Sequence, residues 1–309
     1  MSRRGWVLFL AMGVIWGVPY LFIKVAVETL TPASLVFLRT TVAALLLVPV
    51  ALARGHLRPL LPYWKPLLAY TAAELAIPWL FLAKAEQRLS SSLAGLLLAA
   101  VPLIGALLGW LTRSDRLDWR RVLGLFIGLA GVVALVGLDL GRGDIGALLQ
   151  MAVVATGYAV GPFILARYLS ELPGLGVVAA SLVLTAAAYV IPGVAQIPRQ
   201  WPAAEAIAAV LVLAVLCTAV AFLLFFSLID EVGPVRATVI TYINPAVAVA
   251  LGVALLGEPL TVGIGLGFAL ILIGSVLATR RSPAVCLRAV ARRSHDRPNA
   301  GEPTSPPRA

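Results

Sequence analysis

The sequence predicts an all-α integral membrane protein with ten transmembrane helices, arranged as two inverted repeats of five helices each. Three observations carry this prediction. Hydrophobic residues make up 61% of the 309-residue chain and charged residues only 12%, whereas soluble domains contain about 45–50% apolar and about 25% charged residues. The apolar residues gather in ten spans of membrane-crossing length. The second half of the chain also repeats features of the first half at a constant offset.

The spans are stretches of mainly apolar sequence of about 20 residues, the length that an α-helix needs to cross a bilayer. Charged and turn-forming segments such as "TRSDRLDWRR" and "GEP" separate them. We expect spans at residues 6–27, 32–53, 66–84, 91–111, 122–139, 145–167, 174–194, 205–228, 235–256 and 260–279. The first span is too long for the apolar region of a cleavable signal peptide, and ten spans leave no room for a second soluble domain.

An offset of 143 residues relates the two halves. It places Pro19 over Pro162 and Pro102 over Pro245, and from Ala94 to Gly131 the alignment needs no gap. Because each copy holds five spans, an odd number, the second copy is expected to be upside down relative to the first. We therefore expect one repeat at residues 6–139 and an inverted repeat at 145–280. Inverted repeats are typical of secondary transporters, in which the substrate binds near the membrane midplane.

The basic residues predict the orientation, since cytoplasmic loops of membrane proteins are rich in Lys and Arg. With Arg3 and Arg4 in the cytoplasm, 18 of the 24 basic residues lie on the inner side. Both termini are then cytoplasmic. The loop "TRSDRLDWRR" is basic, whereas its copy "LLGEPLT" has no basic residue, as an inversion requires.

The net charge of +10 has its source in these inner loops and in the C-terminal segment, which would face anionic lipid. We therefore expect no nucleic-acid partner. Residues 281–309 are rich in Pro, Ser and Arg and are expected to form a disordered, basic cytoplasmic tail. Alternatively, the part around Arg288–Arg293 lies on the inner leaflet.

Residues typical of enzymes are missing from the sequence. The only histidines are His56 and His295, and the only cysteines are Cys217 and Cys286, which give no zinc or disulfide pattern. We therefore expect no enzymatic activity, no catalytic residue, no cofactor and no metal. Transport by alternating access is the class of function that remains. Its partners would be a small-molecule substrate, the lipid bilayer and, if transport is coupled, protons, in a monomer or a homodimer.

Ionisable residues inside spans cost about 2.5–3.5 kcal/mol each to insert and are by default functional candidates, and two of them stand out here. Glu74 lies in the middle of the third span and Arg39 lies in the second. In one interpretation they form an ion pair that only locks two helices together. In the other, Glu74 is a site carboxylate that binds a proton or a cationic or amino-bearing substrate.

Five prolines inside the spans should bend their helices, because each leaves a backbone carbonyl without its usual partner. These helix-kink residues are Pro19, Pro78, Pro102, Pro162 and Pro245. Aromatic and polar residues near the bends are expected to line a central cavity, although the ordinary place for a membrane aromatic is the interface. The predicted substrate-binding set comprises Glu74, Arg39, Trp16, Tyr20, Tyr70, Trp79, Tyr158, Tyr242 and Asn244.

Several stretches resemble a known family. "GVIWGVPYLFIKVAV" is similar to the first span, "LSSSLAGLLLAAVPLIGALLGWL" to the fourth, and "GPVRATVITYINPAVAVALGVALLGEPLTVGIGLGFALILIGSVL" to the ninth and tenth spans of the EamA domain pair in the drug/metabolite transporter superfamily. The resemblance covers residues 6–280. It implies an inverted-repeat carrier of the plasma membrane, of the bacterial inner-membrane type, that often exports amino acids, related metabolites or drugs, in some relatives by proton exchange.

The first hypothesis is therefore a secondary transporter, an exporter of a small metabolite, amino acid or drug, with proton coupling through Glu74. The alternative is an uncoupled facilitator or channel-like pore in which Glu74 and Arg39 form a structural pair. A membrane scaffold or sensor with a transporter fold is the third. The offset places Cys217 opposite Glu74 and Leu182 opposite Arg39, so a charged site would belong to one repeat only.

Overall fold

The computed structural model describes residues 1–112, 118–139 and 145–279. These residues form helices joined by short turns, without a strand among them. Ten helical segments in this described part are long and apolar enough to cross a membrane, which confirms the predicted all-α membrane architecture. Cys286 and the segment 281–309, expected to be a tail, lie outside the described residues.

The first half of the chain supplies five of the ten segments. Its elements are α1 (Arg3–Ile15), α2 (Pro19–Ala26), α3 (Pro32–Ala53), η1 (Arg58–Tyr63), α4 (Trp64–Thr71), η2 (Ala72–Ala76), α5 (Ile77–Glu86), α6 (Ser91–Leu98), α7 (Val101–Leu111) and α8 (Trp119–Asp139).

The second half supplies the other five segments. Its elements are α9 (Ile145–Ile164), η3 (Leu165–Leu169), α10 (Gly174–Ala195), α11 (Ala204–Leu211), η4 (Val212–Val220), α12 (Ala221–Val232), α13 (Pro234–Ala237), η5 (Thr238–Tyr242), α14 (Asn244–Leu256) and α15 (Val262–Thr279).

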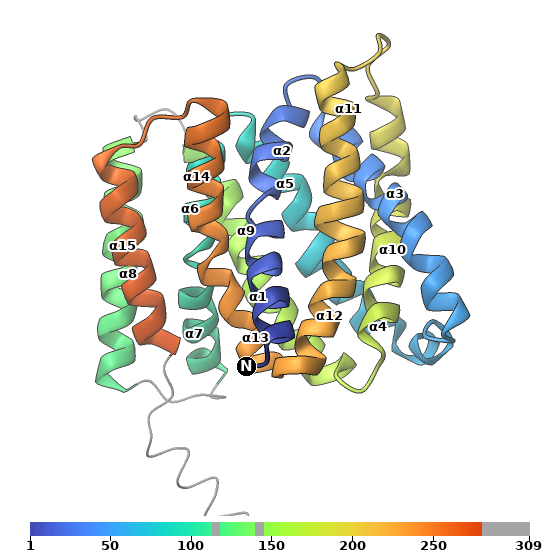
Figure 1. Ribbon diagram of the computed structural model, residues 1–309, viewed down its shortest axis with the longest axis horizontal. Helices are drawn as coiled ribbons and strands as arrows, with labels where there is room; N and C mark the ends of the chain where they lie inside the picture. The colour runs from blue at the N-terminus through green and yellow to red at the C-terminus, as the bar shows by residue number, and fades with distance from the viewer. Residues whose placement is uncertain (113–117, 140–144, 280–309) are drawn as a thin grey trace, which may run out of the picture.

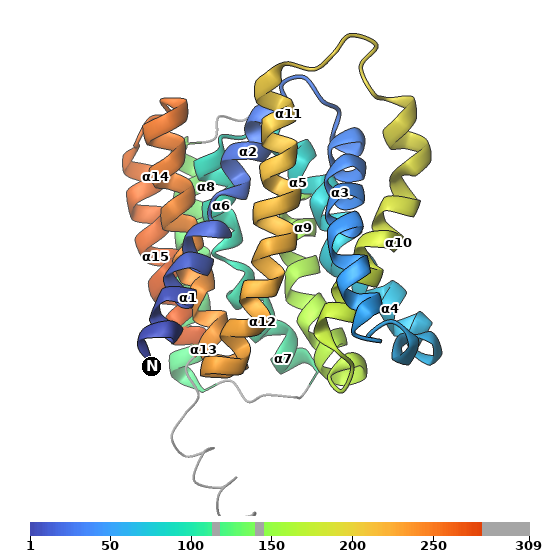
Figure 2. The same ribbon diagram turned by 45° about the vertical axis from the view of Figure 1, so that its right-hand side comes forward.

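The helices stand side by side as a bundle in which elements of the two halves interleave. The pair α8 and α15 closes one side, and the pair α3 and α10 closes the other (Figures 1 and 2). Helix α9 of the second half packs against α5, η2 and α7 of the first half. The N-terminus and the end of α15 lie at the same end of the bundle (Figure 1). The turns after α2, α5 and α14 lie at the opposite end, called here the far end.

The span limits agree with the sequence-based ones for the second and fourth spans, at Pro32–Ala53 and Ser91–Leu111. The third span is longer than predicted, from Arg58 to Glu86. It begins with turns of 3-10 helix over Arg58–Tyr63, residues that lie outside the predicted spans. Its far end adds Glu86, which the sequence placed just outside the membrane.

The five prolines have different effects on their helices. The first span is interrupted between Ile15 and Pro19, and the fourth between Leu98 and Val101, next to Pro102. In the ninth, a 3-10 segment gives way to α14 just before Pro245. Helix α9 continues as an α-helix through Pro162 to Ile164 before the π-helical η3, and a bend at Pro162 stays a prediction.

Candidate functional site

Glu74 lies in the π-helical segment η2, between α4 and α5. Pro78 has no N–H group, so the Glu74 carbonyl cannot accept its usual α-helical hydrogen bond. The Ile77 N–H instead bonds to the Ala72 carbonyl, five residues earlier. Such π-bulges frequently occur at functional sites. The proline thus widens the helix in the middle of the span, at the position of the Glu74 carboxylate.

Two hydrogen bonds hold this widened segment against α10. Before it, the Thr71 hydroxyl donates to the Ser181 hydroxyl at 2.9 Å. After it, the Tyr189 hydroxyl donates to the Ala76 carbonyl at 2.9 Å. The Glu74 side chain lies against α9, next to Gly161.

Two glycines of α9 lie against the π-bulge, and one of them contacts Glu74. A Cβ atom on Gly161 would lie 3.0 Å from the Glu74 carboxyl carbon, and closer still to Oε2. One turn earlier, a Cβ on Gly157 would collide with the Ala73 carbonyl oxygen and lie 2.8 Å from the Pro78 ring. Only glycine therefore allows α9 to approach the π-bulge so closely. The spacing Gly157-x3-Gly161 is a small-residue pattern typical of close helix packing in membranes.

The carboxylate itself is not neutralised by a neighbour. Glu74 Oε2 is buried and has no hydrogen-bond partner, while the residue as a whole is partly accessible. Tyr70 and Tyr158 lie close enough to interact with it electrostatically. A buried carboxylate without a partner is costly, so the site as it stands suits a bound proton or a cation.

Arg39 is held on a different set of contacts. Its Nε donates to Thr218 Oγ1 at 3.1 Å, and its guanidinium carbon lies 3.8 Å from the centre of the Trp79 ring. Stacking on an aromatic face and a directed hydrogen bond both suit the planar guanidinium group. Arg39 is only 7% exposed, yet its Nε is its only hydrogen-bonding atom within the described chain.

The Glu74–Arg39 ion pair of the alternative hypothesis is not formed in the described structure. Arg39 lies on Trp79 and Thr218, and Glu74 Oε2 has no partner. The two side chains occupy different surroundings because the π-bulge turns Glu74 towards α9. Tyr158 interacts with both charges, so the two groups belong to one polar region without neutralising each other.

The region also shows a likeness between the two halves. The 143-residue offset carries η2 onto residues 215–219, which lie inside the π-helical η4. Thr218, which accepts the Arg39 hydrogen bond, lies in that element and itself donates to the Leu213 carbonyl at 2.7 Å. The two widened helices therefore occur at matching positions, although the second has Cys217 in place of the carboxylate.

The remaining predicted site residues separate into two groups. Tyr70, Trp79 and Tyr158 lie around the two charges. Trp16 packs on Phe222 and Phe225, with ring centres 5.8 and 4.7 Å apart. Tyr20 is 9% exposed and belongs to the core between α2 and α6.

Tyr242 and Asn244 instead make scaffold contacts. The Tyr242 and Thr279 hydroxyls lie 3.0 Å apart, which ties η5 to the last turn of α15. The Asn244 amide nitrogen, in its hydrogen-bonding orientation, donates to the carbonyls of Gly13 and Ile240 at 3.0 Å each. Both carbonyls lie next to helix interruptions, which explains why an amide is needed there.

Sequence reasoning missed three residues at the far end. Glu86 is fully buried. Lys24 donates to the carbonyls of Glu86 and Leu89 at 2.7 and 2.9 Å, closing the end of α5. Glu258 accepts from the Ser91 and Ser92 amides at 2.7 and 2.9 Å, capping the start of α6. The "GEP" motif and the lysine are visible in the sequence. The sequence does not show that both bind the turn between α5 and α6.

Among the described carboxylates outside the spans, Glu258 is the one whose pKa departs from its ordinary value. Burial acts to raise the pKa of Glu258, but hydrogen bonds from Ser92 and Ser91 outweigh it and hold this pKa below its ordinary value. The charged form is thus favoured in the folded protein. The carboxylate joins the loop before α15 to the start of α6, one element from each half of the chain.

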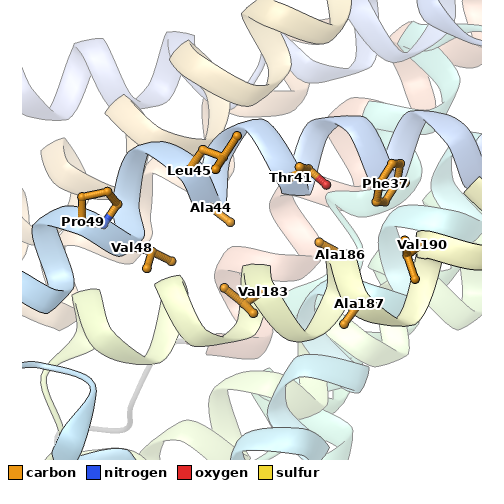
Figure 3. Close-up of a pocket in the computed structure, with 10 residues that line it drawn as sticks. All are labelled: Phe37, Thr41, Ala44, Leu45, Val48, Pro49, Val183, Ala186, Ala187 and Val190. Carbon is orange, nitrogen blue, oxygen red and sulfur yellow. The ribbon is translucent and has the colours of Figure 1, made fainter. Parts of the chain in front are cut away.

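A groove of about 480 Å³ runs between α3 and α10 (Figure 3). Its lining is apolar except for the Thr41 hydroxyl, and exposed side chains such as Leu45 and Val183 stand at its edges. None of the predicted substrate-binding residues lines it. The groove opens on the outer surface of the bundle, so it lies apart from the Glu74 region.

Comparisons with known proteins agree with this architecture. The sequence matches the EamA-like transporter family twice, over residues 3–137 and 143–280. It is 32% identical over 284 residues to the uncharacterized inner membrane transporter YedA of Escherichia coli K12, covering 87% of this chain and 88% of that protein. It is 28% identical over 279 residues to the uncharacterized transporter YvbV of Bacillus subtilis, covering 88% and 90%.

One solved crystal structure shares the fold, with a TM-score of 0.64 and 24% sequence identity, over 90% of this chain and 98% of that one. The double family match spans nearly all of the described helices. The matches to the two transporters also cover most of the length of each of them. The chain belongs to the EamA-like transporter family.

Proposed function

We propose that this transporter exports a small amine-bearing metabolite, an amino acid or a related drug-like amine, across the plasma membrane, and that Glu74 binds the amino group. The observation that carries the proposal is the unpaired carboxylate on a π-bulge in the middle of a span. Ionisable groups in such positions mark substrate and proton pathways. With the N-terminus cytoplasmic, the far end faces outwards.

A zwitterion fits the two charges better than a simple cation does. Arg39 offers guanidinium N–H groups that no described residue accepts, and Glu74 offers carboxylate oxygens. Tyr158 interacts with both. An α-amino acid presents an ammonium and a carboxylate group that match these two, and its side chain would meet the aromatic rings of Trp16 and Phe222.

Glu74 would also be the group that binds the transported proton. A proton and an ammonium group both satisfy the same buried carboxylate, and Glu74 can hold only one of them at a time. Proton entry from the outside would then release the substrate, and substrate binding from the inside would release the proton. Such competition is sufficient to couple export to an inward proton gradient.

The test is transport by purified protein in liposomes under an imposed pH gradient, with a panel of radiolabelled amino acids and aromatic amines. Glu74→Gln should lose gradient-driven flux and also lose thermal stabilisation by the substrate, because a ligand stabilises the state that binds it. Glu28→Gln, an exposed carboxylate at the far end, is the matched control and should behave as wild type. Everted vesicles then give the direction.

Gradient-driven flux that is unchanged in Glu74→Gln would reject coupling through Glu74 and favour an uncoupled facilitator. Absence of flux for every compound in the wild-type protein would favour a scaffold or sensor function instead.

A further inference from the structure

A second carboxylate, Glu86, is buried at the far end of α5, twelve residues beyond Glu74. Its side chain is 0% exposed, and neither Oε1 nor Oε2 has a hydrogen-bond partner. Glu74 has one such oxygen, whereas Glu86 has two. Neither carboxylate oxygen of Glu86 thus receives a hydrogen bond that would stabilise a negative charge.

The neighbouring charged groups are engaged elsewhere. Lys24 directs its ammonium group to the backbone carbonyls of Glu86 and Leu89. Glu258 carries a negative charge of its own, which is held by the amides at the start of α6. The titratable groups that face Glu86 are Tyr20 and Lys24 on α2, Arg39 on α3, Tyr158 on α9 and Glu258 before α15.

A carboxylate that is ionised in such surroundings has to give up its hydration without receiving hydrogen bonds in return. The neutral carboxylic acid avoids most of that cost. We propose that Glu86 is a second proton-binding site of this transporter, and that a proton occupies it in the conformation described here. The site takes a proton and no larger cation, because the Lys24 ammonium already lies beside it.

The position of Glu86 links this proton to the opening of the far end. Lys24 joins α2 to the turn between α5 and α6, and Glu258 joins the same turn to the second half of the chain. If α2 separates from this turn, Lys24 loses its two carbonyl acceptors and water reaches Glu86. The carboxyl proton then passes to water, and water hydrates the carboxylate left behind. This step rests on the proposed transport function.

The first measurement needs no substrate. Infrared spectra of the purified protein at neutral pH report neutral carboxyl groups through their C=O stretching band, which shifts in heavy water. Glu86→Gln should remove a band that wild type and Glu28→Gln show, and Glu74→Gln should leave that band in place. An unchanged band in Glu86→Gln overturns the proposal. So does failure of Glu86→Gln to fold, because an amide replaces a neutral carboxyl group in shape and in charge.

The second measurement uses the substrate found with the wild-type protein in liposomes. Glu86→Gln should keep substrate exchange at equal pH on both sides, while its flux should respond less steeply to a pH gradient than wild-type flux does, because one of two proton sites is lost. A wild-type gradient response in Glu86→Gln overturns the coupling role. If the wild-type protein transports nothing, the proposed function fails, whereas the infrared result still decides whether Glu86 holds a proton.

Discussion

The contact between Gly161 and Glu74 provides the sharpest test of the site geometry. In Gly161→Ala, the new Cβ would lie 3.0 Å from the Glu74 carboxyl carbon and 3.1 Å from its Cβ, and would overlap Oε2. Helix α9 is fixed by its packing against α5 and α7, so the carboxylate has to move. Overpacking of this kind costs about 1–3 kcal/mol.

The assay is reversible denaturant unfolding in detergent micelles, followed by tryptophan fluorescence. Gly146→Ala is the matched control on the same helix, because a Cβ there would meet nothing within 4 Å. That control should unfold within about 1 kcal/mol of wild type, on the stabilising side, since alanine suits a helix better than glycine. Gly161→Ala should be destabilised, and it should lose transport as Glu74→Gln does.

A double-mutant cycle assigns the cost to the carboxylate. In a Glu74→Ala background the carboxyl group is gone, and only the 3.1 Å contact with Cβ remains. The destabilisation by Gly161→Ala should then shrink by about 1 kcal/mol or more, within the range known for contacting residues. If Gly161→Ala costs the same with and without the carboxylate, Glu74 does not lie against α9 as described.

Three further predictions concern the other polar contacts. Lys24→Met removes two charge-assisted hydrogen bonds to carbonyls at the end of α5 and should destabilise the protein by about 1.5–3 kcal/mol in the same unfolding assay; a value near zero would contradict the contact. Glu258 has a lowered pKa, so the stability it contributes is present above the ordinary glutamate pKa of about 4.3 and is lost as the pH falls below it. Wild type should therefore lose more stability than Glu258→Gln between pH 5 and pH 3, and equal losses would refute the assignment. Arg39→Lys keeps the charge but not the planar stack on Trp79, and should cost about 1.5–3 kcal/mol, with substrate affinity falling in parallel; unaltered stability and affinity would show that the guanidinium geometry is irrelevant.

The fold was largely predictable, because the bilayer imposes strong constraints. Helices in lipid must satisfy their backbone internally, so spans of apolar sequence translate directly into helices, as at Pro32–Ala53. The interruptions of the first and fourth helical spans near Pro19 and Pro102 were also predictable, because proline has no N–H group to donate. The effect of Pro162 was not predictable, since neighbouring structure decides whether a proline breaks a membrane helix or is absorbed.

The candidate site was predictable only in part. Glu74 and Arg39 were identified because charges inside spans are costly, but their separation depends on the π-bulge and on Gly161. The hydroxyl contact of Tyr242 with Thr279 could not be predicted, since the depth of a residue in its span does not reveal which helix it faces. Glu86 was missed for a simpler reason: a charge at a span end is normally solvated, and only its neighbours show that it is buried.

The sequence by itself determined the solvent, the ten helices, the duplication at 143 residues and the two unusual charges, because each of these depends on local composition or spacing. The tertiary structure decided which groups meet. It placed Arg39 on Trp79 and Thr218, placed Glu74 against Gly161 of α9, and buried Glu86 between α2 and the turn before α6. Those outcomes depend on how helices far apart in the chain pack together, and the close packing allowed by single glycines is what fixes them.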